Sequence, residues 1–269
     1  MKKLITLILA VVLCALPLVA CGKTEADDNT ISVAASSTPH AEILEICKEI
    51  LAKKGYTLDI RVMDDYIIPN TSTDSGDVDA NFFQHQPYLD NFNATRGTKL
   101  VSVAKVHFEP YGIYAGKCDN LANLPEGAVI AVPNDATNEA RALLLLEANG
   151  IIELKEGVGL SATKNDIVKN PKNVEIREME AALITGVLYD VDCAVINGNY
   201  AIAANLRVSD ALAAEDSESA AFNTYSNILV VKEGNENDPK IQALVEAILS
   251  DEVRDFINKT YDKAVVPVF

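Results

Sequence analysis

Residues 30–62 read TISVAASSTPHAEILEICKEILAKKGYTLDIRV, and this stretch decides the fold class. Residues 31–35 are a short apolar run of the kind that forms a buried strand. Pro39 then opens a segment whose apolar residues recur at helical spacing, and Gly55 follows its cationic end, as is typical of a helix C-terminus. Residues 58–62 alternate between apolar and polar side chains, which predicts a second strand. A strand, a helix and a strand in this order predict an α/β fold with mostly parallel strands.

The same alternation of strands and helices continues to the C-terminus. Further strands are expected at residues 100–108, 111–115, 128–132, 174–178, 192–197 and 227–232. Helices are expected at residues 136–149, 178–189, 199–206, 239–249 and 251–261. The helix that follows Asp238 is well signalled, because this N-cap residue precedes a proline at the first helical position.

The length of 269 residues favours two lobes over a single core. No Pro/Ser-rich linker separates them, so the chain is expected to cross between the lobes on short strands, for which Tyr111–Ala115 and Asn227–Val231 are the candidates. The division that we expect is a first lobe of residues 30–111 plus 228–269 and a second lobe of residues 112–227.

Composition excludes some classes of function. The chain has 23 Lys and Arg against 39 Asp and Glu, which gives a net charge of −16 and opposes binding to nucleic acid. Only three histidines are present, His40, His85 and His107. They lie on separate segments without a carboxylate-rich motif at metal spacing, so neither a metal site nor a cofactor is expected.

The N-terminus predicts export and a lipid anchor. Residues 1–20 combine two lysines with an apolar run that is short for a membrane span, which is the pattern of a signal peptide. The small residue before Cys21 matches the lipobox of bacterial lipoproteins, in which that thiol is acylated and anchors the chain on the extracytoplasmic side. Residues 21–29 are polar and are expected to be a lipidated tether. The alternative is ordinary secretory cleavage beside an incidental cysteine.

Besides the lipidated Cys21, three cysteines remain after the predicted cleavage: Cys47, Cys118 and Cys193. Their number is odd and no C-x-x-C spacing occurs. We therefore expect small core residues and no disulfide framework.

The densest cluster of unusual side chains is at residues 79–90, DANFFQHQPYLD. Phe83, His85 and Tyr88 lie there beside an expected strand-to-helix turn, and Tyr66 follows the preceding strand. Such rings can form a wall for an apolar or polarisable side chain, for example a thioether. The alternative is that they fill the core.

Polar residues at three other places suit the ends of an amino acid. Arg141 shares a helical face with leucines, so its guanidinium is expected to be buried and to bind a ligand carboxylate. The alternative is a salt bridge to an acid of the chain. Asn197 ends a strand, where open α/β sheets bind ligands, and Asn227 begins a later strand. Both amides can donate and accept hydrogen bonds, although either can instead be a turn or cap residue.

Catalytic machinery is missing from the sequence. There is no G-x-S-x-G, P-loop or H-E-x-x-H motif, so we do not expect an enzyme.

Six segments together carry a specific resemblance. They are Thr38–Leu44, Asp79–Asp90, His107–Tyr114, Pro133–Leu146, Asp192–Tyr200 and Ala264–Phe269. Through them the chain resembles, over essentially its whole length, the methionine-binding lipoproteins of bacterial ABC importers, the NlpA/MetQ group. The resemblance implies a periplasmic-binding-protein fold of type II, with two α/β lobes joined by two crossing strands.

The resemblance also implies a site and a mechanism. Carried over by position, the family's side-chain pocket falls on Tyr66, Phe83, His85 and Tyr88, and its contacts to the α-carboxylate and α-amine fall on Arg141, Asn197 and Asn227, with Asn138 nearby. Phe82 stands where smaller residues are common in relatives and is expected to change the pocket depth. Hinge closure would capture methionine or a close relative and present it to the permease and ATPase of an importer.

Alternatives remain open at this point. A metal-binding importer component is one, an extracytoplasmic enzyme acting on amino acids is a second, and a surface adhesin is a third. The sequence also leaves open whether the ligand is L-methionine, D-methionine or a methionine-containing dipeptide.

Overall fold

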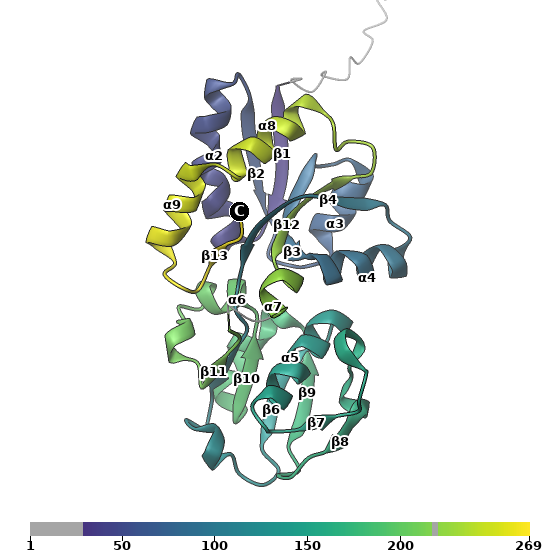
Figure 1. Ribbon diagram of the computed structural model, residues 1–269, viewed down its shortest axis with the longest axis vertical. Coiled ribbons are helices and arrows are strands. Elements are labelled where there is room, and N and C mark those ends of the chain that lie inside the picture. Colours follow the sequence, from purple (N-terminus) through teal and green to yellow (C-terminus); the bar gives the residue numbers. More distant parts are fainter. Residues whose placement is uncertain (1–28, 217–219) are drawn as a thin grey trace, which may run out of the picture.

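The computed structural model describes residues 29–216 and 220–269. Two helix-covered sheets lie one above the other along the long axis of the molecule (Figure 1). The predicted signal peptide, the lipidation site Cys21 and the tether up to residue 28 lie outside the described residues. Within the described ranges, no helix combines the length and apolar character that a membrane crossing needs.

The first sheet has six strands. Their order is β13 (Val266–Pro267), β4 (Leu100–Phe108), β12 (Asn227–Lys232), β3 (Ala80–His85), β1 (Thr30–Ala35) and β2 (Thr57–Val62). Strand β1 runs parallel to β2 and β3, as the opening sequence predicts. Strand β12 lies antiparallel between β3 and β4, so a late segment of the chain is inserted into the middle of a sheet built from early ones.

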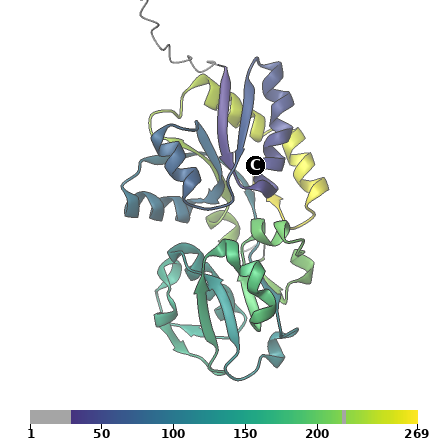
Figure 2. The same ribbon diagram turned by 180° about the vertical axis from the view of Figure 1, so that it is seen from behind.

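Helices cover both faces of this sheet. Helices α2 (Glu42–Lys53), α8 (Pro239–Ile248) and α9 (Asp251–Thr260) pack on one face, and α3 (Ile68–Ser75) and α4 (Gln86–Arg96) pack on the other (Figures 1 and 2). The interior of strand β12, residues 228–231, is apolar, in keeping with the cover on both faces. Its Leu229 and Val231 belong to the core under α2, whereas Ile228 and Val230 pack with Leu89 of α4.

The second sheet has five strands. Their order is β11 (Ala213–Ala214), β5 (Gly112–Ala115), β10 (Cys193–Ile196), β6 (Val129–Pro133) and β9 (Glu175–Met179). Helix α5 (Ala136–Ala148) packs on one face, while α6 (Gly198–Ala203) and a 3₁₀ segment at Ala181–Asp190 pack on the other. Strands β7 (Glu153–Leu154) and β8 (Ile167–Lys169) form a separate small hairpin beside α5.

Two links join the sheets. The first, residues 109–111, leads from β4 to β5. The second leads from β11 through α7 (Ala220–Thr224) back to β12. The two stretches predicted to cross between the lobes are therefore mostly strands of the sheets. Tyr111–Ala115 contains β5, which follows the first link, and Asn227–Val231 lies in β12, which follows the second.

The predicted elements agree with the observed ones except at two helices. The α-helix expected at residues 178–189 is wrong, because β9 continues to Met179 and a 3₁₀ segment follows. That segment contains Gly186 and the β-branched Ile184, Thr185 and Val187, which disfavour an α-helix. The helix expected at residues 199–206 ends earlier, at Ala203. The cysteines Cys47, Cys118 and Cys193 are buried and free, as expected.

Core burial predicts the effect of one substitution in α5. Leu143 is fully buried in the core of the second sheet. Leu143→Ala should lower the free energy of unfolding by about 2–5 kcal/mol, because the cavity left behind does not fully collapse. Urea denaturation measures this change. Leu183, which is 57% exposed, is the control: Leu183→Ala should change the same quantity by about 0.5 kcal/mol or less. Equal effects of the two substitutions would contradict the observed packing.

Candidate functional site

Three aromatic rings form one wall of a cavity between the two sheets. Phe83 lies on β3, Tyr88 on α4, and Tyr66 in the segment that joins β2 to α3. The ring centroid of Tyr66 lies 5.7 Å from that of Phe83 and 5.7 Å from that of Tyr88. The centroids of Phe83 and Tyr88 are 6.0 Å apart. The Tyr88 hydroxyl donates to the main-chain oxygen of Tyr66 at 2.8 Å, which fixes this ring. The sequence-predicted ring wall is therefore present, and it faces a cavity.

His85 connects this wall to the second sheet. It is the N-cap of α4, and its Nδ1 accepts the main-chain N–H of Tyr88 at 3.2 Å. Since Nδ1 is an acceptor, Nε2 carries the ring proton and donates to Oδ1 of Asn138 at 3.1 Å.

Asn138 joins several parts of the site. Its amide nitrogen donates to both carboxylate oxygens of Asp135, the N-cap of α5, at 3.0 Å. A carboxylate only accepts, so this contact fixes the orientation of the carboxamide. Oδ1 of Asn138 then accepts from His85, from the Tyr111 hydroxyl at 2.8 Å and from the Asn197 amide at 3.2 Å. Each polar atom of this side chain thus has a partner within the protein.

Asn197 lines the cavity and has one acceptor atom without a partner. It is the N-cap residue of α6 and is 6% exposed. Its amide nitrogen is used by Asn138, whereas its buried Oδ1 has no hydrogen-bond partner. An unsatisfied buried oxygen costs about 1–3 kcal/mol, so a donor group of a ligand is its natural partner.

Arg141 is held by two rings, an acid and a main-chain oxygen. Its guanidinium carbon lies 4.0 Å from the ring centroid of Tyr111 and 4.3 Å from that of Tyr225. Nε and Nη2 donate to the two oxygens of Glu215 at 2.9 and 2.6 Å, and Nη2 also donates to the Glu109 main-chain oxygen at 2.8 Å. The guanidinium is buried, as expected, but it is already neutralised by an acid of the chain. The salt-bridge alternative is therefore correct, and a cation awaiting a ligand as its only partner is not what the structure shows.

Glu109 brings the first link close to α6. It is 4% exposed, and burial raises the pKa of its carboxyl group. A Cβ atom on Gly198 would lie 2.6 Å from Cβ of Glu109 and 2.7 Å from Oε2, so only glycine fits there. The main-chain N–H of Asn199 donates to this carboxylate.

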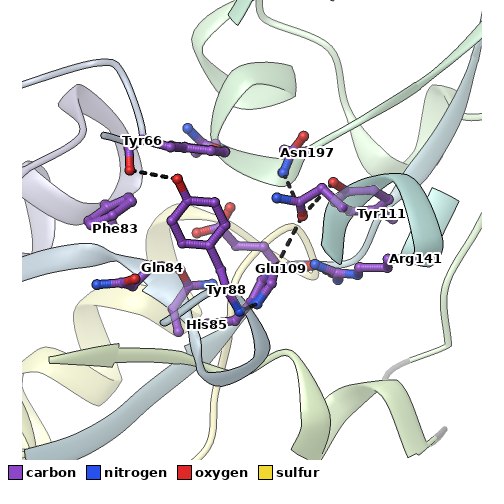
Figure 3. A pocket seen from close by; sticks show the side chains of 13 residues that line it. Tyr66, Phe83, Gln84, His85, Tyr88, Glu109, Tyr111, Arg141 and Asn197 are labelled. Atoms are coloured by element: carbon purple, nitrogen blue, oxygen red, sulfur yellow. Dashed lines mark hydrogen bonds between the residues drawn. The ribbon is translucent and has the colours of Figure 1, made fainter. Parts of the chain in front are cut away.

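These side chains surround a small cavity, whose space for the centres of water-sized molecules is about 20 Å³, enough for about one water molecule (Figure 3). Its lining contains all eight residues that the sequence analysis selected for ligand binding: Tyr66, Phe83, His85, Tyr88, Asn138, Arg141, Asn197 and Asn227. The lining residues that sequence reasoning missed are Gln84, Glu109, Tyr111, Gly198 and Asn199. Gln84 and Gly198 directly adjoin selected residues in the sequence, and Asn199 lies two positions after Asn197. Glu109 and Tyr111 carry no local signal beyond the quoted segment at residues 107–114.

The expectation for Phe82 is wrong. This ring does not line the cavity. Because side chains alternate along β3, Phe82 faces away from the side of Phe83 and packs in the core, 4.6 Å from the ring of His40 and 5.3 Å from that of His107.

The structure also corrects the expectation about the histidines. His40 lies beside His107 and Glu109 although it belongs to a different segment, with one potential ligand atom of each within 4.8 Å of the others. The spacing suits a metal ion, but the facing nitrogens already have protein partners. His107 Nε2 lies 2.7 Å from Oε1 of Glu109, and His40 Nε2 lies 3.0 Å from Oδ1 of Asn227.

Burial keeps all three imidazoles neutral. It lowers the pKa of His40 to about 4 and that of His107 to about 3. The pKa of His85 is lowered to about 3, first by burial and then by the charge of Arg141.

Comparison with known proteins gives consistent matches. The model of the NlpA lipoprotein family matches residues 31–269. The membrane lipoprotein TpN32 of Treponema pallidum is 44% identical, over 96% of this chain and 92% of its own. The methionine-binding lipoprotein MetQ of Bacillus subtilis is 42% identical, over 93% of each chain. A nutrient-binding protein from Burkholderia cenocepacia, solved bound to methionine, superposes with a TM-score of 0.85 at 43% identity, covering 89% of this chain and 100% of its own. These neighbours have the type II periplasmic-binding fold, which is therefore the fold of this chain.

The lowered histidine pKa values predict a pH dependence of stability. In the unfolded chain imidazoles titrate near pH 6.5, so below that pH the unfolded state binds protons that the native state excludes. The contribution of the histidines to the free energy of unfolding is therefore complete above pH 6.5 and falls as the pH drops toward 4. The raised pKa values of Glu109 and Asp135 act in the opposite direction.

A variant isolates the histidine contribution. His107→Gln keeps an N–H donor and removes one titrating group, so between pH 7 and 4.5 its free energy of unfolding should fall by about 2–3 kcal/mol less than that of the wild type. Urea denaturation at four pH values provides the comparison. Parallel curves for the two proteins would mean that His107 is not held neutral.

Proposed function

The chain belongs to the NlpA lipoprotein family, and we propose that it is a lipid-anchored solute-binding protein that captures methionine and delivers it to an ABC importer. Relatives that align over nearly the whole chain are methionine-binding lipoproteins by name, and one structural neighbour was solved with methionine. These likenesses favour a binding protein over the metal-binding, enzymatic and adhesin alternatives.

The cavity carries this proposal because it has two chemically different ends. One end is the ring wall of Tyr66, Phe83 and Tyr88, which suits an apolar and polarisable thioether chain. The other end holds Arg141 and the carboxamides of Asn197 and Asn227. A zwitterionic α-amino acid matches this end, because it brings both an anionic acceptor and a cationic donor.

The free atoms at the polar end support one orientation of the ligand. The unpartnered Oδ1 of Asn197 can only accept a hydrogen bond, so it faces the α-ammonium group. Arg141 and the amide nitrogen of Asn227 can only donate, so they face the α-carboxylate. Asn138 makes no free contact of its own, and its role is to hold His85, Tyr111 and Asn197 in place.

Capture would proceed by closure of two lobes, residues 30–111 plus 228–269 and residues 112–227. The ring wall belongs to the first lobe, and Arg141 and Asn197 belong to the second. A ligand that touches both sets stabilises the closed arrangement, because only that arrangement makes both sets of contacts. Direct bonds between the lobes already exist: the Tyr66 hydroxyl donates to Oδ1 of Asn199 at 2.7 Å, and that of Tyr200 to the main-chain oxygen of Asp64 at 2.8 Å.

The anchor would be the lipidated Cys21, on the extracytoplasmic side of the cell membrane. Tethering keeps the loaded protein at a high local concentration near the importer's permease and its ATPase. Relatives named as membrane lipoproteins support this assignment.

A ligand screen tests the proposal. The protein, freed of retained ligand by unfolding and refolding, is screened by thermal shift against all amino acids in both configurations. L- or D-methionine should raise the melting temperature most, by mass action on the native state, and calorimetry then gives its Kd. No response to either form of methionine would overturn the proposal.

Substitution of Arg141 gives a second prediction. Arg141→Ala should weaken methionine binding by at least about 30-fold, because the cation that faces the carboxylate is lost. The double variant Arg141→Ala/Glu215→Ala removes the acid that the single variant leaves unpaired, and it should be equally impaired in calorimetry.

The control for this prediction is Arg96→Ala. Arg96 is exposed, lies at the end of α4 and also faces a ring, that of Phe92. Its substitution should leave the affinity within about twofold. If the Arg141/Glu215 double variant bound methionine like the wild type, Arg141 would not be the carboxylate-binding residue.

A further inference from the structure

A buried side-chain relay ends at one of the cavity residues. The Ser36 hydroxyl lies 2.6 Å from Nδ1 of His40, and Nε2 of His40 lies 3.0 Å from Oδ1 of Asn227. His40 is completely buried, and Ser36 and Asn227 are 2% and 6% exposed. His40 does not line the cavity, so it can affect a ligand only through a neighbour.

The surroundings of His40 fix its tautomer. Oε1 of Glu109 lies 3.5 Å from Nε2, on the same side as Oδ1 of Asn227. Two acceptors next to Nε2 require that this nitrogen carries the proton, while Nδ1 accepts from the Ser36 hydroxyl. Burial lowers the pKa of His40 to about 4, so the ring stays neutral and the tautomer persists at neutral pH.

A fixed tautomer fixes the carboxamide. If Nε2–H donates to Oδ1 of Asn227, the amide nitrogen of Asn227 must point away from His40. Asn227 is the first residue of β12, where the second link ends, and it lines the cavity. Without His40, the carboxamide could rotate and present its oxygen to a ligand carboxylate, which is repulsive.

We propose that His40 is a positioning residue for ligand binding, which holds the Asn227 amide nitrogen toward the α-carboxylate of the bound amino acid; this inference rests on the proposed function. The rings of Phe82 and His107, at centroid distances of 4.6 and 4.9 Å, keep the imidazole in place. Four segments of the chain, which carry His40, Phe82, His107 and Asn227, thus supply one oriented donor to the site.

A double-mutant cycle tests this role by calorimetry with methionine. His40→Leu removes the donor and should weaken binding about 5- to 50-fold. In the Asn227→Ala background the same substitution should change the affinity less than twofold, because nothing remains to be oriented. Equal losses in the two backgrounds would overturn the inference.

A conservative variant separates positioning from folding. Gln places its Nε2 amide near the position of the imidazole Nε2, so His40→Gln should restore the affinity to within about threefold of the wild type. An equal loss in His40→Leu and His40→Gln would contradict the donor role. Long-range proton–nitrogen NMR of the wild type should show the Nε2–H tautomer of His40, and the other tautomer would also overturn the inference.

Leu44→Ala controls for a general loss of stability in the same lobe. Leu44 is fully buried in α2 and does not touch the cavity, so its variant should be less stable but bind methionine with nearly wild-type affinity. If the wild type itself bound no methionine, the proposed function would fail together with this inference. If the wild type bound but the cycle were additive, only this inference would fail.

Discussion

The rest of the site depends on the burial of one cation. Arg141 lies between two tyrosine rings, where a guanidinium without a counter-charge would cost several kcal/mol. Glu215, which directly follows the edge strand β11, provides that counter-charge. Its carboxylate also accepts a hydrogen bond from the main-chain N–H of Tyr111 at 3.0 Å. The ion pair therefore ties α5 to the first link. Under the proposed function, a ligand carboxylate would meet a fixed donor array that is electrically balanced, so hydrogen-bond geometry would influence its recognition more than net charge.

The sequence predicted the fold and the cavity residues for identifiable reasons. Strands β1 and β2 and the helix between them have clear periodicities, and resemblance to a family supplied the two-lobed arrangement. Residues such as His85 and Asn197 were recognisable because they stand at strand ends, where α/β sheets place their binding groups. The structure brings all eight selected side chains around one cavity.

What could not be predicted are the partners of those residues. Glu215 is 74 positions away from Arg141, and Asn227 is 187 positions away from His40, so no local pattern connects them. For the same reason, the positions of the histidines on separate segments of the sequence suggested that they lie far apart in space. Folding instead places His40 and His107 against Glu109. Phe82 was misjudged because its size was considered without its place in the alternation of β3. A single sequence shows which side chains are unusual, but not which of them satisfy each other.

The links between the sheets are as much part of the site as of the hinge. Glu109 and Tyr111 lie on the first link, and Asn227 ends the second. Glu109 accepts from Arg141 through its main chain and contacts His107 through its side chain, whereas the Tyr111 hydroxyl holds Asn138. A change of backbone angle at Glu109 or Tyr111 would therefore move the partners of Arg141, His107 and Asn138. If capture proceeds by the proposed lobe closure, the affinity of the site and the arrangement of the lobes would be linked in one equilibrium.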